Sequence, residues 1–440
     1  MAESMSEQDP YKVLSDTPGA GARRYSTDSS YWAMTGTQFL GAFNDNVFKQ
    51  LVLLLCVAYV SQSGGQGDTW QSIAQASFAL PFVLLSGFGG FLGDRFSKRS
   101  IVVLCKVAEI VVMAFGAVAL TTSAPDTQAG LIALCGVLFF MGAQSAIFGP
   151  AKYGILPEMM SEQDLPPANG IIQMTTFLAI ILGTVVAGQA VESFKGQLWI
   201  VTAICIGIAI AGTLTSFFVR KTPVAQPDAR LSVDALWINR DLRQLLRADS
   251  LMLRVLLLST LFWFLGGVVI PAVNGFGEVT LGLTESRTSI LAAMMGIGIA
   301  IGCPIAGALS DGRVRFGIVR LGALGIFASL ATVAAAPSMG LTVSQVEGVA
   351  RTALGCLGFF AGLFAVPLQV FLQARPPKEQ KGRMIGSMNL VNWIGILIAA
   401  VFHLIVTKIL GTGSPIEFLI LGLMILPVAL FFRSNEATNP

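Results

Sequence analysis

Apolar residues along the chain gather into twelve long runs, separated by shorter polar segments. Each run is long enough to cross a bilayer as a helix, which needs about 20 predominantly apolar residues. The runs fall at residues 32–61, 71–92, 100–121, 130–157, 166–191, 197–219, 252–279, 288–309, 317–336, 345–373, 384–410 and 415–432. The pattern predicts an all-α membrane protein with twelve transmembrane helices.

The composition agrees with this prediction and excludes several classes of protein. Of the 440 residues, 54% are hydrophobic and 12% are charged, whereas a soluble domain carries about 25% charge. The single histidine, His403, excludes a histidine-rich metal site. All six cysteines lie inside apolar runs, which is typical of buried thiols rather than disulfides. The net charge of +3 is too small to indicate a nucleic-acid partner, and we expect neither a cofactor nor a metal.

Basic residues are unevenly divided between the two sets of loops. Most lie on the side of the termini, including seven between residues 220 and 254. The opposite loops hold only Lys195, Arg287, Arg351 and Lys408. The positive-inside rule therefore predicts that both termini are cytoplasmic.

The breaks between apolar runs also predict the domain organisation. Residues 220–251 combine arginines with leucines at helical spacing, as expected of an amphipathic linker on the cytoplasmic membrane surface. Residues 1–30 are polar and lack the apolar segment of a signal peptide. The expected parts are a disordered cytoplasmic tail (1–30), an N-terminal six-helix bundle (31–219), the linker (220–251), a C-terminal six-helix bundle (252–433) and a second tail (434–440).

The two predicted bundles share a repeat at an offset of 217 residues. Gly90-Phe-Leu-Gly-Asp94 closes the second run, and Gly307-Ala-Leu-Ser-Asp311 closes the eighth. Pro150 and Pro367 have the same separation. Many transporters are built from such repeats.

The segment that follows the first copy carries a family resemblance. Gly90-Phe-Leu-Gly-Asp-Arg-Phe-Ser-Lys-Arg99 resembles the loop motif of the major facilitator superfamily. The resemblance implies two pseudo-symmetric six-helix bundles, and an acid that caps a neighbouring helix and pairs with arginine to hold one conformation closed. The implied gate residues are Asp94, Arg95, Arg99 and Asp311. The alternative is a helix-capping aspartate beside ordinary positive-inside charge.

Ionisable residues inside the spans are functional candidates, because burying them costs several kcal/mol. Gln38, Asp45 and Lys49 share one stripe of the first span, with Asn46 beside the acid. Asp45 lies roughly 20 Å along this helix, near the middle of the bilayer. The alternative is that Asp45 and Lys49, four residues apart, only neutralise each other.

Further polar candidates lie in other spans. Lys152, with Tyr153 beside it, ends the fourth run, where it could contact an anion or extend to lipid phosphates. Lys106 and Glu109 are spaced to pair with each other. The offset of 217 relates Asp45 to Phe262 and Lys152 to Gln369, so the second bundle supplies aromatic and amide groups where the first supplies charge. The remaining candidates are amides that serve either ligand contact or helix packing: Asn169, Gln173, Asn389 and Asn392.

Three stretches narrow the resemblance to the bacterial lysophospholipid transporter family, which also forms the transporter half of fusions with an acyltransferase. They are Gln38-Phe-Leu-Gly-Ala-Phe-Asn-Asp45-Asn46, Pro150-Ala-Lys-Tyr-Gly-Ile-Leu156 and Phe364-Ala-Val-Pro-Leu-Gln369. The resemblance, over residues 35–400, implies movement of lysophosphatidylethanolamine and related lysolipids from the outer to the inner leaflet of the cytoplasmic membrane. The family's midspan acid falls on Asp45 and its fourth-helix lysine on Lys152. Its better-known members have an arginine in the seventh helix, where this chain has Val268-Val-Ile-Pro271.

These expectations define a leading hypothesis. Asp45 would receive the ammonium of the headgroup, and Lys49 and Lys152 would offset its phosphate. The protein would act as a monomer on lysophospholipids among membrane lipids, with a separate acyltransferase acting downstream. The alternative is a proton-coupled exporter of small amphiphiles, with Asp45 as the titrating group.

The sequence argues against an enzyme. His403 lacks the aspartate that a His-x4-Asp acyltransferase pair requires, because Lys408 stands at that spacing. The chain has no Gly-x-Ser-x-Gly serine elbow and no Gly-x4-Gly-Lys-Ser/Thr loop for ATP. Transport without catalysis is the prediction.

Overall fold

The computed structural model describes residues 24–63, 67–122, 127–194, 196–229, 238, 240–310 and 314–432. Within these residues, twelve helices are long and apolar enough to cross a membrane, as predicted. Their bounds are α1 Ser29–Ser63, α2 Gly67–Arg95, α3 Lys98–Thr122, α4 Gln128–Met159, α5 Leu165–Ser193, α6 Trp199–Phe217, α8 Ser250–Gly275, α9 Glu285–Leu309, α10 Phe316–Ala335, α11 Val343–Ala374, α12 Lys381–Leu404 and α13 Ser414–Phe431. Short π-helical turns, Phe276–Thr280 and Ile405–Ile409, extend α8 and α12.

Several helix starts follow from capping chemistry in the sequence. The Thr127 side chain accepts a hydrogen bond from the Gly130 backbone N–H at the start of α4. Asp249 accepts two backbone N–H groups at the start of α8. Thr342 and Gln345 form a reciprocal capping box at the start of α11. Such caps satisfy donors that the first helical turn leaves without partners.

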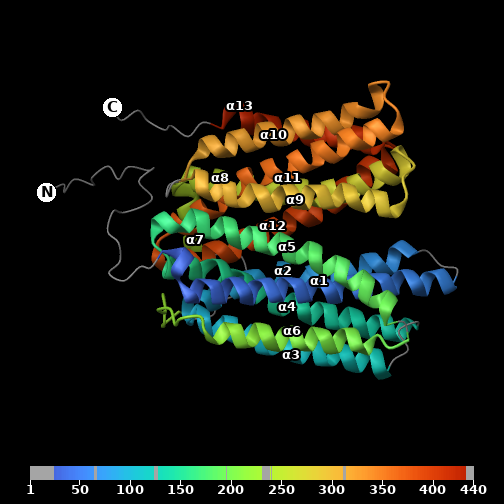
Figure 1. Ribbon diagram of the computed structural model, residues 1–440. Helices are drawn as coiled ribbons and strands as arrows, with labels where there is room; N and C mark the ends of the chain where they lie inside the picture. The colour runs from blue at the N-terminus through green and yellow to red at the C-terminus, as the bar shows by residue number, and fades with distance from the viewer. Residues whose placement is uncertain are drawn as a thin grey trace.

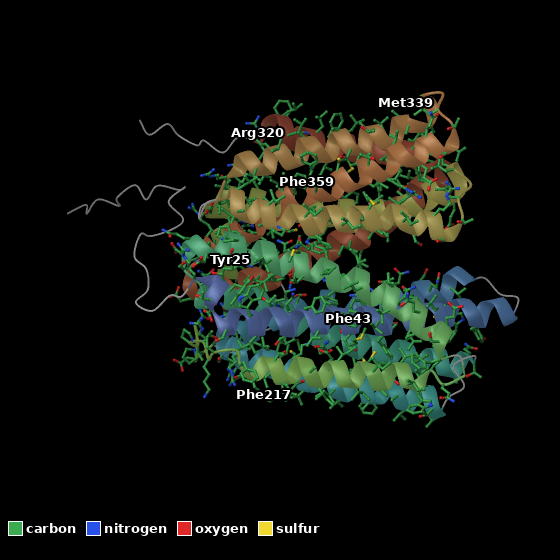
Figure 2. All side chains as sticks on the ribbon, in the orientation of Figure 1. Tyr25, Phe43, Phe217, Arg320, Met339 and Phe359 are labelled. Carbon is green, nitrogen blue, oxygen red and sulfur yellow. The ribbon has the colours of Figure 1, made fainter. Side chains whose placement is uncertain are left out.

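The helices form two bundles of six, α1–α6 and α8–α13, coloured blue to green and yellow to red in Figure 1. Helix α1 begins and α13 ends at the same end of the molecule, which we call the terminal side. Apolar side chains cover the outside of both bundles, as expected of surfaces that face lipid. Phe217, labelled at the lower edge of Figure 2, is one of them.

The linker contains a short helix, α7 (Arg240–Ala248). Its Leu242 and Leu246 are buried in the apolar core of the second bundle, so α7 packs against protein along its leucine face. Residues 230–237 and 239 lie outside the described residues, and so do residues 1–23 of the first predicted tail and all of the second, 434–440.

The two bundles meet closely on the terminal side through small residues. A Cβ atom on Gly90 of α2 would lie 2.8 Å from the Gly382 carbonyl oxygen of α12. A Cβ atom on Gly307 of α9 would lie 2.8 Å from the Pro166 carbonyl oxygen of α5. Gly90 and Gly307 are the repeat positions 217 residues apart, so the repeat in the sequence corresponds to two equivalent seams between the bundles.

The seams continue to the middle of the molecule. The rings of Phe82 on α2 and Trp393 on α12 are stacked with centroids 4.2 Å apart. Ile181 of α5 lies directly against Gly296 of α9. Beyond this level the ribbons of α5 and α9 diverge toward the end away from the termini (Figure 1).

Candidate functional site

Asp45 lies half-buried on α1, in contact with α4. The Ser145 hydroxyl donates a hydrogen bond to Asp45 Oδ2 at 2.6 Å, and Gln144 Nε2 donates to Ser145 Oγ at 2.7 Å. Asp45 Oδ1 is buried and accepts no hydrogen bond from the described residues. One oxygen of the midspan carboxylate therefore has unused accepting capacity, which is costly for a buried polar atom.

Lys49 does not neutralise Asp45 directly. No ion pair within 4.0 Å joins these two residues in the described part of the chain, and their charges interact only at longer range. The Lys49 Nζ atom instead lies 5.2 Å from the centroid of the Phe78 ring on α2. A cation over an aromatic face keeps its positive charge available to a further partner.

Lys152 belongs to a chain of hydrogen bonds that links three helices. Its Nζ donates to Thr176 Oγ1 on α5 at 2.9 Å, and Thr176 Oγ1 donates to Gln38 Oε1 on α1 at 2.8 Å. Gln38 Nε2 then donates to Thr175 Oγ1 at 2.7 Å. Lys152 is only 6% exposed and also lies over the Tyr153 ring. It therefore points into the protein and does not extend to lipid phosphates.

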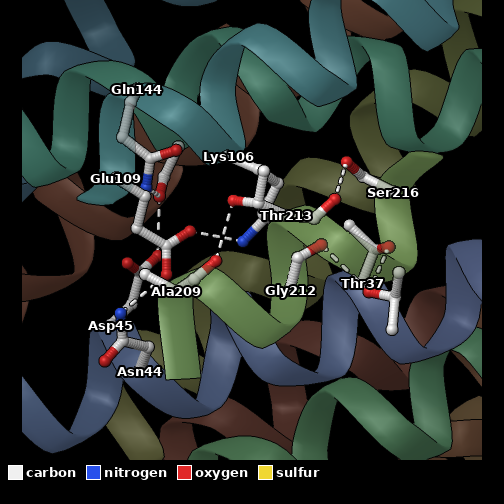
Figure 3. Close-up of polar contacts among 12 residues, drawn as sticks. Thr37, Asn44, Asp45, Lys106, Glu109, Gln144, Ala209, Gly212, Thr213 and Ser216 are labelled. Atoms are coloured by element: carbon white, nitrogen blue, oxygen red, sulfur yellow. Dashed lines mark hydrogen bonds and ion pairs between the residues drawn. The ribbon is translucent and has the colours of Figure 1, made fainter. Parts of the chain in front are cut away.

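A fully buried ion pair supports the helix that carries Asp45. Lys106 and Glu109 of α3 pair with each other, as their spacing predicted. Asn44 Nδ2 donates to Glu109 Oε1 at 2.7 Å (Figure 3). The Lys106 ammonium also lies against Gly41 of α1. Because the charges are paired and hydrogen-bonded, they can remain buried. The pair fixes α1 against α3 next to Asp45.

The candidates of the second bundle are aromatic or amide groups. Phe262 of α8 stacks on Phe364 of α11, with ring centroids 6.1 Å apart. Both Phe262 and Tyr153 pack against two buried apolar clusters, one of which contains residues from both bundles. Within the described residues, Gln173 Nε2 and Gln369 Nε2 are buried donors without an acceptor. These two amides are available to a ligand that carries acceptor oxygens.

The other predicted amides hold helices together. Asn169 exchanges two hydrogen bonds with Gln373 of α11. Asn392 Oδ1 accepts from the Ser259 hydroxyl at 3.2 Å, and Asn389 packs against Gly149 of α4. Asn46 Nδ2 donates to the carbonyl oxygen of Ala42 one turn earlier. In this conformation these groups serve packing, and their contact with a ligand stays a prediction.

The predicted gate acid caps a helix of the opposite bundle. Asp94 is buried, and it accepts the backbone N–H groups of Gly382 at 2.8 Å and Arg383 at 3.0 Å, at the start of α12. Arg383 Nε also lies 3.7 Å from Asp94 Oδ2. A carboxylate at a helix N-terminus satisfies free donors and interacts favourably with the helix dipole.

The arginine that pairs with Asp94 is not one of the predicted two. Arg95 lies over the rings of Phe91 and Phe96, and Arg99 donates to the carbonyl oxygens of Phe217 and Val219 at the end of α6. Both side chains therefore have their partners within their own bundle. Asp311, the predicted second gate acid, lies outside the described residues.

Comparison with known proteins decides the family. The model of the Major Facilitator Superfamily matches residues 34–400. The chain belongs to this superfamily. The superfamily fold is also found in the solved proton:xylose symporter XylE, which superposes with a TM-score of 0.72 at 14% identity, over 92% of this chain and 95% of that protein.

Two relatives of this superfamily protein have a more specific name. The chain is 29% identical to the lysophospholipid transporter LplT of Photorhabdus laumondii, over 87% of this chain and 89% of that protein. The chain is 26% identical to the lysophospholipid transporter LplT of Serratia proteamaculans, over 86% of this chain and 88% of that protein. These matches confirm the resemblance predicted from the motifs around Asp45 and Lys152.

Sequence reasoning missed several residues of the site in this superfamily member. Ser145 and Thr176 contact Asp45 and Lys152 directly, and Arg383 is the cation beside Asp94. Hydroxyl pairs such as Thr175-Thr176 inside an apolar run were the available signal. Threonine and serine are common in membrane helices, however, so that signal is weak without a structure.

Proposed function

We propose that this protein is a lysophospholipid transporter of the bacterial cytoplasmic membrane. It moves lysophosphatidylethanolamine and related lysolipids from the outer to the inner leaflet by alternating access, with both termini in the cytoplasm. The observation that carries the proposal is the free Oδ1 atom of Asp45, in the bundle that also presents the ammonium groups of Lys49 and Lys152.

This arrangement suits a zwitterionic headgroup. The ammonium of an ethanolamine headgroup would bind Asp45 Oδ1, and the phosphate would lie toward Lys152 and the free amide donors of Gln173 and Gln369. Charge-assisted hydrogen bonds of this kind are about twice as strong as neutral ones. The acyl chain would contact the aromatic wall of Phe262 and Phe364.

The seams between the bundles support the direction of movement. Asp94 with α12 and Asn169 with Gln373 close the terminal side, whereas α5 and α9 diverge toward the other end (Figure 1). With the termini in the cytoplasm, this is a state that receives its substrate from the outer leaflet. The relatives named lysophospholipid transporter support the choice of substrate.

The direct test is uptake of labelled lysophosphatidylethanolamine into proteoliposomes by purified protein. Asp45→Asn keeps the volume of the side chain and removes its charge, so we expect uptake to fall by about tenfold or more, as for one lost charge-assisted contact. Glu162→Gln, at an exposed acid of the loop before α5, is the matched control and should leave uptake unchanged. Full uptake by the Asp45→Asn protein at equal reconstitution would contradict the proposal.

One observation favours a second candidate, a proton-coupled exporter of small amphiphiles. A half-buried carboxylate with one free oxygen can carry a proton as well as bind an ammonium group. In that case an imposed pH gradient should drive movement of an amphiphilic dye in the wild type and not in the Asp45→Asn protein, without lysolipid uptake in either. Lysolipid uptake without dye movement would exclude the exporter.

A further inference from the structure

Two arginines converge on one buried acid at the end of the second bundle away from the termini. Arg287 of α9 donates from Nε to Glu347 Oε1 at 3.2 Å and also pairs with Oε2. Arg351 of α11 donates to Glu347 Oε1 at 2.5 Å. The Glu347 side chain is 4% exposed, whereas those of Arg287 and Arg351 are 48% and 38% exposed. The acid is enclosed, and both guanidinium groups reach the surface.

The cluster carries a surplus positive charge. One carboxylate neutralises one of the two guanidinium groups, so Arg287, Glu347 and Arg351 together retain a formal charge of +1. Arg351 Nε is buried and has no acceptor among the described residues. Each guanidinium has five N–H donors in a planar fork, and that geometry matches the oxygens of a phosphate. Fastening α9 to α11 would need only one of the arginines.

The cluster lies at the ends of two membrane-spanning helices, where a bilayer presents its polar headgroups. Arg287 lies next to the first residue of its membrane span, Ser286, and Glu347 and Arg351 lie in the first turns of α11. Met339, in the loop before α11, marks this end of the bundle in Figure 2. Basic residues are scarce on this side of the chain, and two of the four in its predicted loops meet at Glu347.

An apolar stripe extends from Arg287 along the surface of α9. Ile290, Ile297 and Ile301 are exposed and follow Arg287 at intervals of three, seven and four residues, which places them on one face of the helix. A phosphate bound at the arginines would have hydrocarbon surface directly beneath it. This pairing of charge and apolar surface selects a lipid over a free anion.

We propose that Arg287 and Arg351 form a binding site for the phosphate of a lysolipid in the outer leaflet, with its acyl chain along the isoleucine stripe of α9. The inference rests on the proposed function for its substrate class. Helix α9 also forms the seam with α5 of the first bundle. A lysolipid held there lies at the end of the molecule where α5 and α9 diverge (Figure 1).

The test counts bound lysophosphatidylglycerol, which has a phosphate and no ammonium group, by native mass spectrometry of the full chain in maltoside micelles. We expect Arg351→Gln to weaken the binding of one lysophosphatidylglycerol molecule about tenfold, as for one lost charge-assisted contact. Binding of a monoacylglycerol, which lacks phosphate, should not change. The matched control is Arg254→Gln, at an exposed arginine of the terminal side whose side chain hydrogen-bonds to Ser250.

A second variant separates binding from folding. Glu347→Gln removes the competing carboxylate, so it should strengthen phosphate-lipid binding even if it lowers the unfolding temperature. Equal affinity in the wild type and the Arg351→Gln protein would overturn the proposal, as would weaker binding in the Glu347→Gln protein. Displacement of the lipid by an equal concentration of inorganic phosphate would also overturn it, because the site would then bind free anions.

The same measurement distinguishes this site from the central one. Lys152→Gln should weaken the binding of a different lipid, the one at the central site, and should leave lipid binding at the α9–α11 site unchanged. Failure of Lys152→Gln to change binding or uptake would count against the proposed function alone. If the Arg351→Gln protein lost uptake but bound the same number of lysophosphatidylglycerol molecules as the wild type, the result would count against the α9–α11 site alone.

Discussion

Asn169 of α5 and Gln373 of α11 join the two bundles by a reciprocal pair of amide hydrogen bonds. Asn169 Nδ2 donates to Gln373 Oε1 at 2.8 Å, and Gln373 Nε2 donates to Asn169 Oδ1 at 2.9 Å. Both side chains are completely buried. This pair must separate whenever the terminal side opens, so its strength contributes to the balance between the two states of the transporter.

The amide pair predicts non-additive effects of substitution. Gln373→Leu leaves Asn169 Oδ1 buried without a donor, while Asn169 Nδ2 keeps the Leu165 carbonyl oxygen. This change should destabilise the closed terminal side by about 1–3 kcal/mol. Asn169→Leu with Gln373→Leu should cost less than the sum of the single changes. Distances between spin labels on the terminal ends of α5 and α11 would report the populations with the terminal side closed and open. Gln163→Leu, at an exposed position, is the control, and strict additivity would show that the amides act independently.

The seam at Gly90 predicts a steric block. A Cβ atom there would lie 2.8 Å from the Gly382 carbonyl oxygen and 3.1 Å from Gly386 Cα, which is backbone that cannot move away. We expect Gly90→Ala to reduce lysolipid uptake by about fivefold or more, because overpacking costs about 1–3 kcal/mol in the closed state alone. Gly136→Ala, which meets nothing within 4 Å, should retain uptake. Equal uptake by both variants would mean that the terminal side never closes this tightly.

The cap formed by Asp94 predicts a graded series. Asp94→Asn keeps one acceptor for the start of α12 and loses the charge, whereas Asp94→Ala loses both. We expect the closed state to lose about 1 kcal/mol in the first variant and about 2 kcal/mol in the second. Accessibility of an introduced cysteine at Ser387 to a thiol reagent applied from the terminal side would measure the change. The same accessibility in both variants would show that the cap does not contribute.

The buried pair of Lys106 and Glu109 predicts rescue by a second substitution. Glu109→Gln leaves the Lys106 ammonium buried without a counter-charge, which should lower stability by about 3–5 kcal/mol. Adding Lys106→Met removes that charge, while the new amide oxygen can still accept from Asn44 Nδ2. The double variant should therefore be more stable than Glu109→Gln in thermal unfolding in detergent. A double variant less stable than the single one would show that the ammonium has another essential partner.

Much of the fold was predictable because hydropathy is a local property. The twelve spans follow from runs of apolar residues, and their ends differ from the predicted ones by a few residues where caps and π-helical turns extend the helices. The equivalence of Gly90 and Gly307 was visible as a repeat before their seams were known. Asp45 was also identifiable, since a midspan acid is costly wherever its helix packs.

The partners of these residues were not predictable, because they come from distant parts of the chain. Asp45 binds Ser145, Asp94 binds the start of α12, and Lys152 reaches Gln38 through Thr176. Each partner depends on which helix faces are brought together, and composition says nothing about that choice.

The sequence by itself determined the class of protein, its spans and the acid in its first helix, since the cost of burying charge and of exposing apolar surface acts at every position independently. Only the tertiary structure decided that Lys49 lies over an aromatic ring and that Arg383, rather than Arg95 or Arg99, pairs with Asp94. Hydrogen bonds and ion pairs act over a few ångströms, so their choice depends on how the helices pack.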